Sequence, residues 1–215
     1  MRQSFHESLQ ELKNDVLKMA SLVEESIDKS IKALQNGDID LAKQVKKDDE
    51  KIDQLELSVE EKCTKLIALQ QPVAKDLRLI LVISKFVTDL ERMGDHASNI
   101  AEQVLEIGQE ELIKPLIDIP RMGEIAIRRL HQSLDAFVNM DIELAKQIAR
   151  EDEEIDILDC QILRELISFM LEDQKTIKQA TALMFVSRFL ERIGDHSTNI
   201  CERVIYLVNG EYEHY

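Results

Sequence analysis

The sequence predicts an all-α protein of six helices, arranged as two tandem antiparallel three-helix bundles related by an internal pseudo-repeat. Only 6 glycines and 3 prolines occur among 215 residues, which indicates long helices with few, short connections. Apolar residues recur at steps of three and four, the spacing of a helix with one buried face. The line at 90–104 also returns at 190–204, identical at ten of fifteen positions.

Three helices are expected in the first half. Gly37 can adopt the left-handed conformation that ends a helix, and Asp38 can cap the next one. Pro72 cannot continue a helix but suits the first turn of a new one. These signals predict helices over 4–36, 38–69 and 73–107.

The second half repeats this plan after an irregular segment, 108–120, which contains Pro115 and Pro120. We therefore expect one bundle in residues 1–110 and the other in 111–215. Residues 36–56 match 139–159 at twelve of twenty-one positions with an offset of 103, whereas the offset in the last helix is 100. The difference places a three-residue deletion in the turn at 172–176. Both halves are expected to stack, either end to end or side by side, into one rod-like protein. The expected helices are 121–139, 141–171 and one ending near 208.

Acidic residues outnumber basic residues by 42 to 27, giving a net charge of −15. Binding to nucleic acid phosphates is therefore not expected, and cations or basic protein surfaces are better partners. The longest apolar run, 79–83, is far too short to cross a membrane, so we expect a cytoplasmic protein without direct membrane insertion. Cys63, Cys160 and Cys201 share no metal-ligand spacing and are expected to be small buried hydrophobes without disulfides.

The repeated line carries a row of oxygen-bearing side chains opposite its apolar face. Residues at four-residue steps lie on one face of a helix. The preceding helix of each half carries a second pair of acids at the same spacing, extended by one turn to Glu56 or Asp159. The candidate set is Asp49, Asp53, Glu91, Asp95 and Asn99 in the first half, and Asp152, Asp156, Glu191, Asp195 and Asn199 in the second.

Oxygen ligands without a thiolate are typical of sites for Mg²⁺, Mn²⁺, Ca²⁺ or iron. The simpler alternative is a solvated acidic face, in which Arg92 and Arg192 pair with the aspartates three residues later. Because the spacing occurs on two helices in each of two repeats, metal binding is the favoured hypothesis. His96 and His196 are expected either to support the ligands or to pair with acids at the surface.

The repeated Glu-Arg-x-Gly-Asp-His-x-x-Asn-Ile line, preceded each time by an Asp-x-x-x-Asp helix, resembles the paired acidic motifs of the PhoU family. The likeness covers essentially the whole chain. It implies two three-helix bundles, often dimeric, that bind metal ions such as Fe, Zn, Mn or Mg through the candidate acids. Some members have a third acid where this chain has Asn99 and Asn199.

The resemblance also implies a regulator rather than an enzyme. PhoU proteins restrain the sensor kinase of the Pho regulon when phosphate is plentiful, and their partners are a PhoR-type sensor histidine kinase and a PstB-type transporter ATPase. The expected role is a metal-binding adaptor between these partners, held at the inner face of the membrane through them and forming a homodimer. Direct phosphate sensing is not expected, because an acidic groove repels phosphate unless metal ions reverse its charge.

Two other classes of function stay open on the sequence. A carboxylate-bound iron store or oxidase would place Glu-x-x-His pairs inside a bundle, yet that spacing occurs only at Glu211 and His214. A purely structural helical spacer would need the apolar faces but neither pair of acids. Metal analysis separates these alternatives.

Overall fold

The computed structural model describes residues 2–150 and 153–211, and within this part every element is helical. The all-α prediction is confirmed. The first half contains α1 (Arg2–Asn36), α2 (Ile39–Gln70) and α3 (Ala74–Ile107). The second half contains α4 (Asp118–Asn139), α5 (Ile142–Arg150), α6 (Glu153–Glu172), a 3-10 turn (Gln174–Thr176) and α7 (Ile177–Asn209).

Helices α5 and α6 together take the place of the single helix expected over 141–171. Residues 151–152, which separate them, lie outside the described residues, and the predicted ligand Asp152 lies there too. Helix α4 begins at Asp118, three residues before the predicted start. The turn at 172–176 is the tight connection expected from the deletion, and the Asp173 carboxylate accepts a hydrogen bond there from the Lys175 amide.

The same capping chemistry starts the second helix of each half. The Asp38 carboxylate accepts a hydrogen bond from the Leu41 amide at 2.9 Å, and Asp141 accepts one from the Leu144 amide at 3.0 Å. Gly37 has φ 62°, a left-handed conformation that glycine adopts without steric cost. The sequence signals at these helix ends therefore predicted the local structure correctly.

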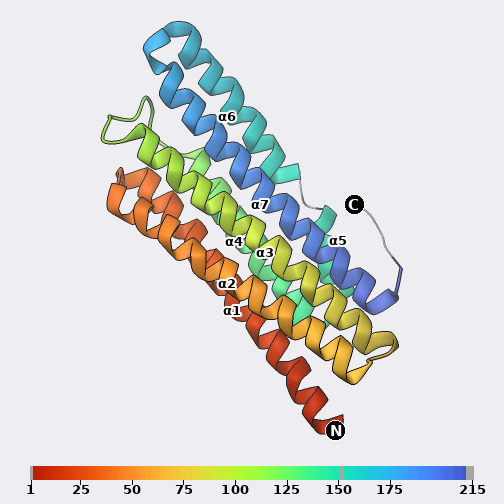
Figure 1. Ribbon diagram of the computed structural model, residues 1–215. Helices are drawn as coiled ribbons and strands as arrows, with labels where there is room; N and C mark the ends of the chain where they lie inside the picture. Colours follow the sequence, from red (N-terminus) through yellow and green to blue (C-terminus); the bar gives the residue numbers. More distant parts are fainter. Residues whose placement is uncertain (1, 151–152, 212–215) are drawn as a thin grey trace.

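The two halves lie side by side and share one interior. Figure 1 shows the helices running along a common long axis, with α3 and α7 together in the middle. Helices α1 and α2 pack on α3, whereas α4, α5 and α6 pack on α7, and α1 also contacts α4. Phe86 of α3 meets Phe137 of α4 edge to face, with 4.8 Å between ring centroids. This fully buried pair joins the halves through their apolar core.

The connection between the halves is held against α7 rather than left in solvent. Gln179 of α7 is buried and hydrogen-bonds this connection twice. Its Oε1 accepts from the Ile113 amide at 2.5 Å, and its Nε2 donates to the Glu111 carbonyl at 3.0 Å. Leu112 and Leu116 pack on the core beside it. Helix α4 is shorter than its counterpart α1 in the first half, because it lacks the first turns of that helix. The connecting segment covers part of the second half instead.

The cysteines are free, as expected, but not all are buried. Cys63 and Cys201 are enclosed in the core, whereas Cys160 is exposed. The prediction of a buried Cys160 was wrong because this position lies on the outer face of α6. Within the described residues, none of the helices combines the length and the apolar character needed to cross a bilayer.

Candidate metal site and repeat interface

Five carboxylates from two helices gather in the groove between α2 and α3, and we call them the first acid cluster. Asp49, Asp53 and Glu56 come from α2, and Glu91 and Asp95 come from α3. Burial raises the pKa of Asp49, and the carboxylates of Asp53 and Asp95 raise it further. Burial, followed by repulsion from Asp95 and Glu56, raises the pKa of Glu91 to about 7. Mutual repulsion of this kind requires the five groups to lie near one another.

Gly94 allows the two walls of this groove to approach closely. A Cβ atom at position 94 would lie 3.0 Å from Cδ1 of Ile52 and 3.3 Å from Oδ1 of Asp49. The close approach at this glycine is made by side chains of α2 and not by its backbone. Oδ1 of Asp49 is buried and has no hydrogen-bond partner, an unfavourable state for a carboxylate oxygen unless a cation binds it.

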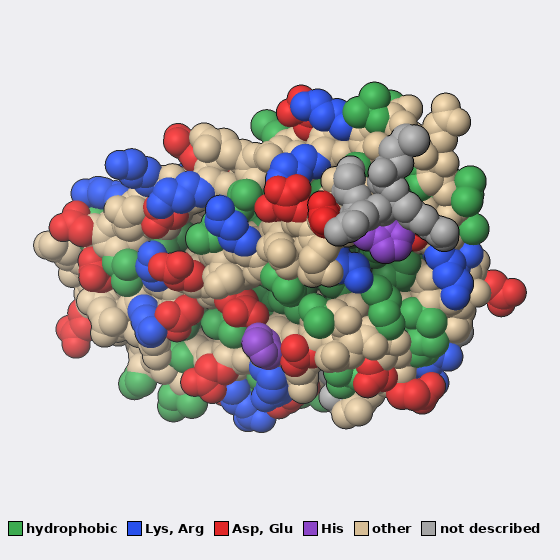
Figure 2. Space-filling view, turned by 90° about the horizontal axis from the view of Figure 1, so that it is seen from below, with side chains coloured by type: hydrophobic (Ala, Val, Ile, Leu, Met, Phe, Trp, Pro, Cys, Tyr) green, Lys and Arg blue, Asp and Glu red, His purple; other side chains and the backbone are tan. Residues whose placement is uncertain are grey.

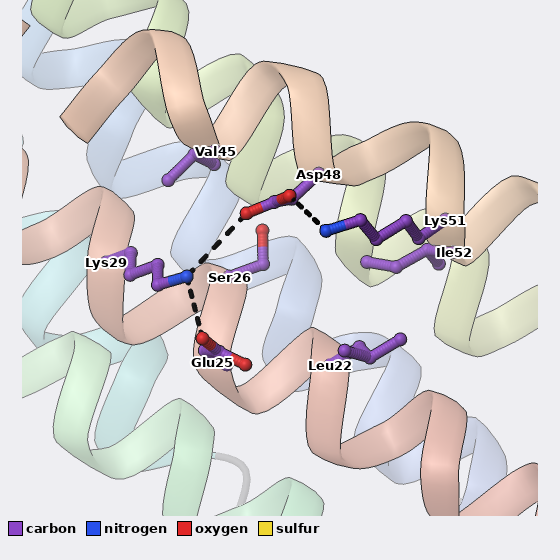
Figure 3. Close-up of a pocket in the computed structure, with 8 residues that line it drawn as sticks. All are labelled: Leu22, Glu25, Ser26, Lys29, Val45, Asp48, Lys51 and Ile52. Atoms are coloured by element: carbon purple, nitrogen blue, oxygen red, sulfur yellow. Dashed lines mark hydrogen bonds and ion pairs between the residues drawn. The ribbon is translucent and has the colours of Figure 1, made fainter. Parts of the chain in front are cut away.

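The neighbouring Asp48 provides an internal comparison, because it faces α1 instead of α3. Figure 3 shows its carboxylate between two lysines, with Lys51 Nζ at 2.6 Å and Lys29 Nζ at 3.7 Å. The hydrogen bond from Lys51 holds the pKa of Asp48 below its usual range. A small cavity of about 130 Å³ adjoins these groups. Consecutive aspartates on α2 therefore have opposite environments, one neutralised by lysines and one crowded by acids.

The residues of the first acid cluster fit a hard cation in donor type and charge. They supply only carboxylate oxygens, which is the preference of Mg²⁺, Mn²⁺ and related ions. Among the described residues, however, no three histidine, cysteine, aspartate or glutamate side chains are already arranged to hold one ion. Sharing an ion therefore requires rotation of these side chains, which the partly exposed Asp95, at 41 % side-chain exposure, allows.

The corresponding acids of the second half, Asp156, Asp159, Glu191 and Asp195, are called the second acid cluster. Here a basic side chain enters the groove. Nη1 of Arg188 lies 2.6 Å from Oε1 of Glu191 and 4.0 Å from Oδ2 of Asp159. The pKa of Glu191 is raised by burial and by Asp195, while Arg188 opposes the rise.

Arginine pairing within the repeated line occurs in both halves. Arg92 lies 3.4 Å from Glu91 and 3.5 Å from Asp95. Arg192 lies 3.4 Å from Asp195. The pairing proposed as the simpler alternative is therefore present, but both arginines are at least half exposed, and such ion pairs contribute little.

Three polar residues of the second copy, His196, Asn199 and Arg203, lie where α7 meets α3. Asp89 is the central group, with a side chain only 6 % exposed. Its Oδ2 accepts from Nε of Arg203 at 2.7 Å, and its Oδ1 lies 3.1 Å from Nδ1 of His196 and 3.5 Å from Nδ2 of Asn199. His196 therefore pairs with an acid, which was one of the two expectations for the histidines. The pair lies at the contact between the two repeats and not at the protein surface. The amide of Asn199 is directed to Asp89, and its role as a ligand stays a prediction.

His96 occupies the matching place on α3 and is surrounded by rings instead of acids. It stacks on Phe189 at 5.7 Å between centroids and lies 5.8 Å from the ring of His196. Burial, with nearby positive groups, lowers the pKa of His96 to about 4. The side chain is thus neutral near pH 7, and the expectation of a surface histidine paired with an acid was wrong for His96.

Sequence reasoning missed Asp89 because it precedes the repeated line. One signal was available. Asp89 follows Thr88 and precedes the apolar Leu90, and its counterpart in the second copy is Phe189. A charged residue that replaces an aromatic one within an apolar row indicates a buried ion pair.

Comparison with known proteins gives a consistent result over the whole chain. The family model for the PhoU domain matches twice, at residues 16–104 and 119–204. The phosphate-specific transport system accessory protein PhoU homolog of Aquifex aeolicus is 45% identical over 203 residues, covering 94% of this chain and 92% of that protein. The phosphate-specific transport system accessory protein PhoU of Escherichia coli is 39% identical over 207 residues, covering 96% and 86%.

Solved structures agree with the fold. The crystal structure of PhoU from Pseudomonas aeruginosa superposes with a TM-score of 0.92 at 38% identity, covering 96% of this chain and 100% of that one. The phosphate transport system regulatory protein PhoU from Streptococcus pneumoniae gives a TM-score of 0.91 at 34% identity, covering 98% and 100%. These relatives are named as accessory or regulatory proteins and not as enzymes.

Proposed function

The chain belongs to the PhoU family, and from this premise we propose that it is a non-enzymatic regulator of phosphate uptake and of Pho regulon signalling. The observation that carries this proposal is the full-length similarity to proteins named as accessory to phosphate-specific transport. In the proposed role the protein is an adaptor that contacts a PstB-type transporter ATPase and a PhoR-type sensor histidine kinase, and it acts as a homodimer.

Metal binding is the second part of the proposal. The first acid cluster would hold an Fe, Zn, Mn or Mg ion, because its carboxylates repel one another and one buried oxygen of Asp49 has no partner. When bound, the ion would neutralise the cluster and fix α2 against α3. It would also present positive charge on a protein whose net charge is −15, which gives an anionic partner group a place to bind.

The distribution of charge favours recognition through proteins over direct sensing of phosphate. On the face seen in Figure 2, acidic side chains are interspersed with Lys and Arg and do not form one continuous acidic patch. Such mixed surfaces suit specific protein contacts, in which complementary charges set orientation. Free phosphate would be repelled by the net charge unless a bound cation attracts it.

Storage or oxidation of iron has little support in the bundle interior. In the described part of the chain, Asp89 is the one carboxylate in the buried class, and it is already bonded to Arg203 and His196. A di-iron centre needs several carboxylates projecting inward. Regulation through a surface metal site therefore explains the arrangement of acids better.

A pull-down tests the adaptor role. The full chain is immobilised and offered the transporter ATPase and the cytoplasmic part of the sensor kinase, with and without Mn²⁺. We expect both partners to be retained, more strongly with Mn²⁺, and we expect the Mn²⁺ effect to disappear in an Asp49→Asn, Asp95→Asn double variant. Asp48→Asn is the matched control, because this acid already has lysine partners. Retention of neither partner in any condition would refute the adaptor role, and sedimentation of the full chain tests the homodimer.

A further inference from the structure

The outer face of α6 carries a stripe of apolar side chains that no other described element covers. Figure 1 shows α6 at the edge of the molecule, where it packs on α7, α4 and the 3-10 turn. The large apolar side chains on its free side are between 37 % and 83 % exposed: Ile157, Leu163, Ile167 and Leu171. They follow one another at steps of three and four residues, with the exposed Cys160 between the first two, and so form one continuous surface. Continuous apolar surfaces of this kind mark contact sites.

The matching helix of the first half shows that the fold does not require this stripe. Helix α2 takes the place of α6 in the repeated plan, with an offset of 103 residues. At the positions of the four apolar residues, α2 carries polar or small side chains: Gln54, Glu60, Thr64 and Ala68. The apolar face of α6 therefore serves a purpose other than the packing of one bundle.

The stripe has a symmetric arrangement about Cys160. Ile157 precedes Cys160 by three residues and Leu163 follows it by three, so a large apolar side chain lies on each side. Asp156 precedes Cys160 by four residues and Arg164 follows it by four, so opposite charges lie at equal distances from the centre. A shallow hollow over Cys160 is lined by four residues of this set: Asp156, Ile157, Cys160 and Arg164. A surface of this kind is complementary to a second copy of itself that runs in the opposite direction.

We propose that the outer face of α6 is the surface through which two copies of this chain associate, antiparallel and with the two-fold axis at Cys160. The inference rests on the homodimer of the proposed function and assigns its interface. The stripes of the two copies cover each other, which removes the exposed apolar surface from water.

Charge complementarity favours a second copy as the occupant of this face. In the antiparallel pair, Arg164 of each copy lies at the level of Asp156 of the other, because both are four residues from the axis. Within the described part of the chain, the guanidinium of Arg164 forms no ion pair. The pairing therefore gives this arginine a carboxylate partner twice in each dimer, which fixes the register of the two helices.

The geometry also places the two Cys160 thiols within reach of each other. Packed helices have axes about 8–10 Å apart, and each Cα atom lies about 2.3 Å from its helix axis. Facing Cα atoms at the two-fold axis are thus about 3.5–5.5 Å apart, which overlaps the range of about 4.4–6.8 Å that a disulfide spans. Cys63 and Cys201 are enclosed in the core, so a crosslink between copies reports on Cys160.

Sedimentation equilibrium of the full chain in chelator tests the apolar part of the interface. The double variant Ile157→Gln, Ile167→Thr gives α6 the residues that α2 carries at the same positions, Gln54 and Thr64. We expect it to raise the dimer dissociation constant by about tenfold or more, since each dimer loses four buried isoleucines. Leu57→Gln is the matched control and should change nothing, because Leu57 is 65 % exposed on α2 at the position of Cys160.

A charge exchange tests the register. Arg164→Asp places like charges at the same level of the two copies, and we expect it to weaken the dimer by about tenfold. Adding Asp156→Arg reverses both charges and should restore most of the wild-type affinity. Neither change enters the core, since both side chains are exposed on α6.

Oxidation of the full chain with copper phenanthroline tests the position of the axis. We expect a covalent dimer in the wild type and none in Cys160→Ser. Circular dichroism confirms that each variant is folded.

Three results would overturn the inference: a chain that stays monomeric at every concentration, a dimer unaffected by both the isoleucine and the charge variants, or a dimer without a Cys160 crosslink. Failure of the proposed function has a different signature. An insensitive dimer would keep the homodimer and place its interface elsewhere, whereas loss of the transporter ATPase and the kinase in the pull-down, with the α6 dimer intact, would remove the adaptor role alone.

Discussion

Replacing Glu91 by glutamine removes a carboxylate whose charged form is disfavoured first by burial and then by repulsion from Asp95 and Glu56. The pKa of Glu91 is about 7, compared with 4.5 for an unperturbed glutamate, a difference equivalent to about 3 kcal/mol if it acted in full. The side chain is 19 % exposed, and solvent screening reduces the effect to about 1–2 kcal/mol. We expect Glu91→Gln to raise the free energy of unfolding by this amount at pH 8 in the presence of chelator.

The pH dependence of this gain has a definite sign. The folded protein keeps the Glu91 proton up to about pH 7, whereas the unfolded chain releases it near pH 4.5. The folded state therefore binds more protons between these values, and its stability falls as the pH rises through this window. The advantage of glutamine should be absent below pH 4.5, grow between pH 4.5 and 7, and stay constant above pH 7.

Urea unfolding at pH 4.5 and pH 8, with chelator or with Mn²⁺, measures these effects. Mn²⁺ should stabilise the wild type more than Glu91→Gln, because the variant lacks a ligand. Glu191→Gln is the matched control in the second half. Because this variant loses the contact with Arg188, it should gain less stability than Glu91→Gln or lose stability. A gain of equal size at both pH values, or no gain at pH 8, would refute the reasoning that burial and repulsion disfavour the charged form of Glu91.

Three further predictions concern the repeat interface and the groove. Asp89→Ala should lower the free energy of unfolding by about 2–4 kcal/mol, because Arg203 loses its partner in a buried pair; a loss below about 0.5 kcal/mol in urea titration would contradict this. His96→Phe should reduce the loss of stability between pH 6.5 and pH 4. In this range the unfolded chain gains a proton on His96, whereas the folded protein, in which the pKa of His96 is about 4, does not. An unchanged pH profile of thermal unfolding would count against this prediction. Gly94→Ala should cost about 1 kcal/mol, because the new Cβ would lie 3.0 Å from Cδ1 and 3.2 Å from Cγ2 of Ile52. Adding Ile52→Val removes the nearer atom, Cδ1, and should recover part of this loss. No recovery in the double variant would show that the contact with Cδ1 is not the cause.

Much of the candidate site could be derived from the spacing of its residues. The four-residue steps placed Glu91 and Asp95 on one face of α3, and Asp49 and Asp53 on one face of α2. The structure brings these faces together in one groove. Spacing within a helix does not reveal which neighbouring helix a face meets, so the different environments of Asp48 and Asp49 could not be predicted.

Contacts between the repeats were beyond the reach of sequence periodicity. His96 and His196 have the same neighbours in the repeated line, yet one contacts Phe189 and the other Asp89. Their partners come from the opposite repeat, about a hundred residues away. Only the packing of α3 against α7 could place them.

The sequence by itself determined the helices, their ends and the doubling of the plan, because apolar period, capping residues and glycine act over a few residues along one chain. The tertiary structure decided how the halves share a core, which acids are crowded and which are neutralised by Lys29, Lys51 or Arg188. Charges act through space, and their effect depends on burial and on the nearest opposite charge. Two copies of one motif have therefore acquired different electrostatic environments.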